Sequence, residues 1–174
     1  MMHSMLDEVD ALGPWTAHIQ TMNQTLAQND PEAAVRAWRM AYTAALSDSG
    51  WRGLLTVATA ALRLRAFPGV TREAVTRARE TYWIAFFRAR QQSCLDGVLS
   101  AAAAFESLGD SAAFERSIRT AEVLVTRTGE AAKIERLRRF IETVTGRPEW
   151  GHKNLRFPEL TSFPEAVDTP VAPS

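Results

Sequence analysis

The chain of 174 residues contains one cysteine, Cys94, and only three histidines. A single cysteine excludes an intramolecular disulfide and a thiolate metal cluster within one chain. The histidines, His3, His18 and His152, lie far apart in the sequence, and none has a partner at the spacing of metal ligands. The sequence therefore predicts no metal and no other cofactor, and we expect a reducing, cytoplasmic setting.

Long apolar runs and catalytic motifs are missing too. The apolar run Ala101 to Phe105 is far shorter than the roughly 20 residues of a membrane helix. The N-terminus carries Asp7, Glu8 and Asp10 without a basic residue, unlike a signal peptide. No G-x-S-x-G motif, Gly-rich phosphate loop or apolar-face carboxylate pair occurs. We therefore expect neither membrane contact nor enzymatic activity.

Lysine is scarce, since Lys133 and Lys153 are the only two, and arginine carries most of the positive charge. With the abundant alanine, this bias suggests GC-rich coding, as in a bacterial gene. The net charge is zero, but it is unevenly distributed. Seven arginines form a basic cluster: Arg63, Arg65, Arg72, Arg77, Arg79, Arg88 and Arg90. We interpret this cluster first as a solvated helix face.

Apolar side chains recur at steps of three and four residues through most of the chain, which predicts helices with one buried face. The stretch 98–125 contains two such runs on either side of Leu108-Gly109-Asp110-Ser111. Gly109 suits the left-handed residue that ends a helix, and Asp110 or Ser111 can cap the next one. This stretch therefore predicts an antiparallel helical hairpin.

The same reasoning predicts an all-α protein of about seven helices. Besides the two helices of the 98–125 hairpin, they are Pro14 to Ala27, Pro31 to Leu46, Trp51 to Ala66, the helix that follows Thr71 and ends at a break near Gln91 to Ser93, and Glu130 to Thr145. Thr71 is expected to cap its helix, and the last helix is expected to be a terminal cap with a polar outer face. Residues 1–145 thus form the helical domain, with a short lead-in helix over residues 4–12.

The tail, residues 146–174, contains five prolines, which forbid a long regular helix. Five of its side chains make it more apolar than a free tail should be: Trp150, Leu155, Phe157, Leu160 and Phe163. We predict an extended tail, disordered over 166–174, whose residues 148–163 lie against the helices.

The hairpins repeat every 40 residues, because three small or apolar positions recur at that interval. The three sets are Ala34, Trp38 and Ala41; Ala74, Ala78 and Thr81; and Phe114, Ile118 and Ala121. Repeats of this kind stack, so that neighbouring hairpins bury a continuous core.

The spacing Ala34-x3-Trp38-x2-Ala41 resembles the small–aromatic–small signature in the second helix of tetratricopeptide repeats (TPR). Leu108-Gly109-Asp110 is similar to the turn that joins the two helices of that family. The resemblance covers about residues 15–127, with a period of 40 in place of the family's 34. It implies a TPR-like solenoid of stacked antiparallel hairpins.

The resemblance also implies a protein–protein interaction module, an adaptor or chaperone-like protein that holds a protein or peptide partner in a groove. The first helix of each hairpin would line that groove. The register of these first helices places the following residues in the groove, with Ala103 beside them: Gln20, Asn23, Thr56, Thr59, Arg63, Leu99 and Ser100. Asn and Arg offer directed donors for a peptide backbone or carboxylate. The alternative is that these side chains only face solvent.

Three other functions stay open. The basic cluster from Arg63 to Arg90 could bind nucleic acid through phosphate contacts, although the neutral net charge argues against it. A small-molecule pocket could lie between helices near Trp38, Tyr42, Trp83 and Phe86. A homodimer could form through the surface of residues 82–87.

Overall fold

The computed structural model describes residues 13–146, and all of its regular secondary structure within that range is helical. The elements are α2 (Trp15–Ala27), α3 (Pro31–Ser47), α4 (Arg52–Ala61), the 3-10 helix η1 (Leu62–Ala66), α5 (Thr71–Gln91), α6 (Leu95–Ser107), α7 (Ser111–Thr128) and α8 (Ala131–Thr145). The prediction of an all-α protein with seven α-helices is confirmed. The lead-in helix over 4–12 and the tail beyond residue 146 fall outside the described residues.

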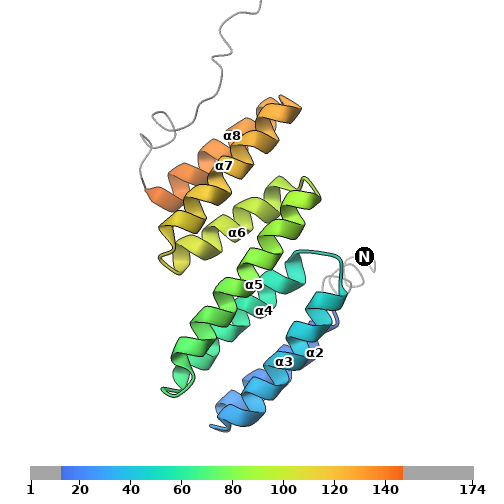
Figure 1. The fold of residues 1–174 in the computed structure, drawn as a ribbon, viewed down its shortest axis with the longest axis vertical. Helices are drawn as coiled ribbons and strands as arrows, with labels where there is room; N and C mark the ends of the chain where they lie inside the picture. The colour runs from blue at the N-terminus through green and yellow to red at the C-terminus, as the bar shows by residue number, and fades with distance from the viewer. Residues whose placement is uncertain (1–12, 147–174) are drawn as a thin grey trace, which may run out of the picture.

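Successive helices pack as antiparallel hairpins, α2 with α3, α4 with α5 and α6 with α7, and α8 lies beside α7 (Figure 1). The first helices also contact one another in order: α2 meets α4, α4 meets α6, and α6 meets α8. We call α2, α4, α6 and α8 the first-helix row. We call the second helices, α3, α5 and α7, the second-helix row, and they run in the same direction as one another (Figure 1).

Three of the turns between helices end the preceding helix in the same way. Asn29, Ser93 and Gly109 adopt left-handed conformations, with φ of 58°, 51° and 71°. In each turn the N–H of the residue after the left-handed one donates to a carbonyl five residues earlier, and so satisfies one of the last carbonyls of the helix. The three bonds run from Asp30 N to Thr25 O, from Cys94 N to Ala89 O, and from Asp110 N to Phe105 O. Ser93 explains how the helix ends near Gln91 without Gly or Pro.

The helix starts agree with the sequence at two positions and differ at one. Asp30 and Asp110 accept hydrogen bonds from the backbone N–H groups of Ala33 and Ala113, as N-caps do. The predicted cap at Thr71 is wrong. Its hydroxyl donates backwards, to the carbonyls of Arg65 and Phe67 at 3.2 Å, because the 3-10 turn before it leaves those acceptors within reach.

The repeated positions form the core. None of the nine residues in the three 40-residue sets is more than 6% exposed, and Ala34, Ala41, Ala78 and Ala121 are fully buried. Small side chains at these positions let the two helices of a hairpin approach closely. Trp38 is the large member of its set, and its indole N–H donates to the Val57 carbonyl of α4 at 3.0 Å. The positions that recur every 40 residues in the sequence therefore also recur as buried contacts in the core.

Two tryptophans of the first-helix row lie on glycines of the next helix. A Cβ built on Gly53 would lie 2.6 Å from the Trp15 ring, and one on Gly97 would lie 2.7 Å from the Trp51 ring. A side chain at either position would force the neighbouring atoms to shift, so both positions favour glycine. Trp15 thus joins α2 to α4, and Trp51, at the start of α4, joins it to α6.

In the second-helix row, Arg88 of α5 fastens the C-terminal end of α3. Its guanidinium donates to the Leu46 carbonyl at 2.8 Å and to the carbonyls of Ala45, Asp48 and Gly50. Ala45 and Leu46 lie in the last turn of α3, whose carbonyls have no intrahelical partners, and Asp48 and Gly50 follow the end of the helix. A cation there also suits the negative end of the helix dipole.

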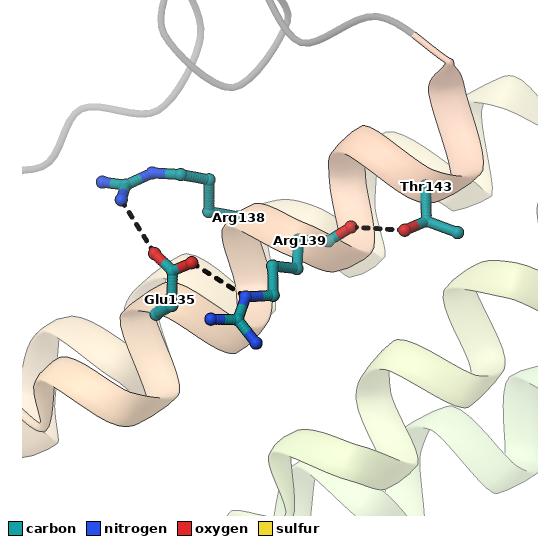
Figure 2. A network of polar contacts seen from close by, with 4 residues as sticks. All are labelled: Glu135, Arg138, Arg139 and Thr143. Carbon is teal, nitrogen blue, oxygen red and sulfur yellow. Dashed lines mark hydrogen bonds and ion pairs between the residues drawn. The ribbon is translucent and has the colours of Figure 1, made fainter.

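The last helix, α8, has the predicted form of a terminal cap. Leu137 and Ile141 are fully buried. On its outer side, Figure 2 shows the Glu135 carboxylate between Arg138 and Arg139, at 3.0 and 2.9 Å. The hydrogen bond from Arg139 is the main cause that lowers the pKa of Glu135. A polar outer face of this kind closes a stack of hairpins.

Candidate functional site

A hollow of about 520 Å³ lies on the first-helix row between α2 and α4. Its lining consists of Trp15, Thr16, Ile19, Gln20, Trp51, Arg52, Leu55 and Thr56. The two tryptophans and Ile19 are buried among other side chains and form an apolar floor, whereas Gln20, Arg52 and Thr56 are exposed and form a polar rim. Two of the predicted groove residues, Gln20 and Thr56, therefore lie at this hollow.

Three more predicted residues continue the same helix faces beyond the hollow. Asn23 follows Gln20 by three residues on α2, and Thr59 follows Thr56 by three on α4. The Arg63 guanidinium donates to the Asn23 side-chain oxygen at 2.8 Å, and both residues are exposed. The structure therefore brings together Asn23 and Arg63, which are 40 residues apart in the chain.

Thr59 is already engaged within the protein. Its hydroxyl donates to the Leu55 carbonyl and lies 3.0 Å from the Tyr82 hydroxyl of α5. Burial raises the pKa of Tyr82, and the Thr59 contact partly offsets that effect. Thr59 therefore helps to hold α4 on α5.

The two predicted groove residues on α6 differ in their positions. Leu99 is only 5% exposed and belongs to the core, so the expectation that it lines a groove is corrected. The reason is that α6 contacts α4, α5, α7 and α8, which cover more of its surface than one apolar stripe. Ser100 is exposed and Ala103 is half-buried, but neither lines the hollow between α2 and α4.

The basic cluster is divided among several local contacts. Arg63 bonds to Asn23, and Arg88 holds the end of α3. Arg77 lies 3.7 Å from Glu73 and 3.5 Å from Glu80, and Arg79 pairs with Asp110 at 2.6 Å. Arg65, Arg72 and Arg90 are exposed. Four of the seven guanidiniums thus bind groups of the protein itself, which disfavours a shared phosphate-binding surface.

The surface proposed for dimerisation, residues 82–87, is mostly interior. Tyr82 and Phe86 are buried, whereas Phe87 is 45% exposed and stacks on the half-buried Trp83 at 5.7 Å. The Arg116 guanidinium lies 5.6 Å from the Trp83 ring centre. The part of this surface that reaches solvent therefore consists of Phe87 and the half-buried Trp83 and Ile84.

The aromatic residues named for a small-molecule pocket fill the space between helices. Trp38 stacks on Tyr42 at 5.5 Å, and Trp83 packs edge-on against Phe86 at 5.4 Å. The hollow beside Trp38 has about 20 Å³, room for about one water. Within residues 13–146, no group of three His, Cys, Asp or Glu side chains could hold a metal ion. None of the helices described has the length and hydrophobicity of a bilayer-crossing segment.

Sequence reasoning missed the floor of the hollow. Trp51 was named only as the first residue of a predicted helix, and neither Trp15 nor Arg52 was named as a site residue. A usable signal was present, because each tryptophan stands at or just before the first residue of a first helix. Equivalent positions on adjacent helices tend to meet.

No protein-family model and no curated protein matches this chain.

Proposed function

We propose that this protein is a TPR-like interaction module, an adaptor or chaperone-like protein that holds an extended partner segment across the first-helix row. The observation that carries this proposal is the hollow between α2 and α4, with its floor of Trp15, Ile19 and Trp51. An apolar floor inside a polar rim is the arrangement in which an anchoring side chain contributes most to binding.

The rim suits a peptide backbone. Gln20 offers an amide donor and acceptor, and Arg52 offers guanidinium donors, on opposite helices of the hollow. The Thr56 hydroxyl donates to the Arg52 carbonyl and retains acceptor capacity towards solvent. A peptide lying along the row would therefore find polar partners on both sides of its anchoring residue.

A steric block tests the proposal. Random peptides displayed on phage would be selected against the full chain, against Thr56→Trp, and against Thr76→Trp, a matched control at an exposed position on α5. We expect Thr56→Trp to abolish enrichment, since a bulky side chain would fill the hollow, and Thr76→Trp to retain it. Equal enrichment on all three proteins, with unchanged circular dichroism, would exclude the hollow as the binding site.

A further inference from the structure

The first-helix row has a one-sided charge at the hollow. α4 contains Arg52 and η1 contains Arg63 and Arg65, whereas none of α2, α4 and η1 contains an aspartate or a glutamate. Arg52 and Arg63 are exposed on these elements, and Arg52 lines the hollow itself. The surface that would receive a partner is therefore positive, although the net charge of the whole chain is zero.

The partners of these two arginines are neutral. The Arg52 guanidinium lies 4.7 Å from the centre of the Trp51 ring, and Arg63 bonds to the Asn23 amide. Neither has a carboxylate at ion-pair distance among residues 13–146, whereas Arg79 and Arg136 pair with Asp110 and Asp96. Both guanidiniums are held in place, because one lies against a ring and the other is bonded to an amide, yet their charges are not neutralised.

The spacing of the two charges suits an extended chain. Arg63 follows Arg52 by 11 residues, the last two of them in the 3-10 helix η1, a rise of about 17 Å at about 1.5 Å per residue in α4 and about 2.0 Å in η1. An extended peptide advances about 3.3 Å per residue, so this distance corresponds to about five residues.

We infer that the partner segment is acidic, with two carboxylate side chains about five residues apart and an apolar side chain between them. This inference rests on the proposed function. The apolar side chain occupies the hollow, one carboxylate pairs with Arg52 at its rim, and the other pairs with Arg63. Charge-assisted hydrogen bonds to guanidinium are among the stronger polar contacts, and they also steer association.

The test uses a short acetylated, amidated peptide that carries two glutamates about five residues apart, a phenylalanine between them, and glycine and serine elsewhere. Its affinity for the full chain would be measured by calorimetry at low and high salt. We expect Arg52→Gln and Arg63→Gln each to weaken binding about tenfold, which corresponds to about 1.4 kcal/mol. Arg72→Gln, an exposed control on α5, should bind the peptide as the parent chain does. A peptide with glutamine in place of both glutamates should bind at least tenfold more weakly.

Three results would overturn the inference. Equal affinity for the glutamine peptide would show that charge is not recognised, and the proposed function would still stand if Thr56→Trp abolished that binding. Tighter binding of an oligothymidine, unaffected by Thr56→Trp, would indicate nucleic acid instead. One variant would combine Asp7→Asn, Glu8→Gln and Asp10→Asn. If this variant bound the peptide more tightly than the parent chain, the protein's own N-terminal segment would be the occupant.

Discussion

Two contacts join neighbouring members of the first-helix row across one 40-residue repeat, and they differ in charge. Near the beginning of the chain, Arg63 donates to the neutral Asn23, and near the end Arg136 pairs with Asp96 at 3.0 Å. At the α6–α8 end the positive charge is matched within the protein. At the α2–α4 end, no carboxylate of residues 13–146 pairs with Arg63.

The two ends also differ in what covers them. The surface of α8 carries Glu135 between two arginines, so its charges are satisfied locally (Figure 2). The face between α2 and α4 has an apolar hollow beside two arginines that have no carboxylate partner among the described residues. One end thus resembles a terminal cap, and the other has the features of a binding surface.

The largest expected effect concerns the corresponding contact in the second-helix row, where Arg88 reaches Asp48, also 40 residues away. Arg88→Met would leave several carbonyls at the end of α3 without a donor and should lower the free energy of unfolding by about 3 kcal/mol. Arg90→Met, at an exposed position two residues on, should change it by less than about 0.5 kcal/mol. Urea unfolding would measure both, and similar losses would show that Arg88 is not a structural contact.

Next in size are the glycines under the tryptophans. Gly97→Ala should cost about 2–3 kcal/mol, because a Cβ there would meet both the Trp51 ring and the Ala89 Cβ. Gly53→Ala should cost less, about 1–2 kcal/mol, since only the Trp15 ring at the beginning of α2 has to shift.

Gly69→Ala is the matched control for these two, because nothing lies within 4 Å of a Cβ at that turn. Thermal unfolding of the three variants would rank them. A loss for Gly69→Ala equal to that for Gly97→Ala would contradict the role given to the tryptophans.

A smaller effect comes from exchanging the charges of the two cross-repeat contacts. Asn23→Asp would turn the first contact into an ion pair and should stabilise the fold by less than about 1 kcal/mol. It should also weaken binding of the acidic peptide, because Arg63 would be neutralised.

Asp96→Asn makes the opposite change at the other end. It should remove a similarly small, salt-sensitive contribution. Unfolding in low and high salt would separate the two contacts: the parent Asp96–Arg136 pair should weaken with salt, and the Asn23–Arg63 bond should respond less. An equal salt response would remove the distinction between the two ends.

The smallest effect is the pH dependence of α8. The pKa of Glu135 is lowered in the folded state from its ordinary value of 4.5, first by the hydrogen bond from Arg139. Its stabilising contribution is therefore complete above pH 4.5 and is lost as the pH falls through the lowered folded value. The melting temperatures of the parent chain and Glu135→Gln should differ at neutral pH and converge in acid. A constant difference across that range would contradict this assignment.

Much of the fold could be predicted because its signals are local. Asp30 and Pro31 mark the start of α3, Gly109 marks the end of α6, and the apolar steps of three and four define the helices between them. The break near Gln91 to Ser93 was predicted although no Gly or Pro marks it, and the left-handed conformation of Ser93 makes that break. The function of Thr71 was missed, because its hydroxyl has acceptors before it as well as donors after it, and only the path of the chain selects between them.

The site was predicted less completely. Gln20 and Thr56, which the tetratricopeptide resemblance assigned to one groove, both line the hollow between α2 and α4. Leu99 was misplaced, because the repeat does not say how many neighbours cover a helix. The basic cluster looked continuous in the sequence, but a helix directs consecutive arginines to different sides, where they meet different partners.

The sequence by itself determined the helices, their turns and the 40-residue period, because these depend on steric and hydrogen-bonding preferences within a few residues. Only the tertiary structure decided that Arg63 meets Asn23, that Arg88 holds the end of α3, and that a hollow lies between Trp15 and Trp51. Those features arise between groups that lie far apart along the chain. Their distances are set by how whole helices pack, which no local pattern encodes.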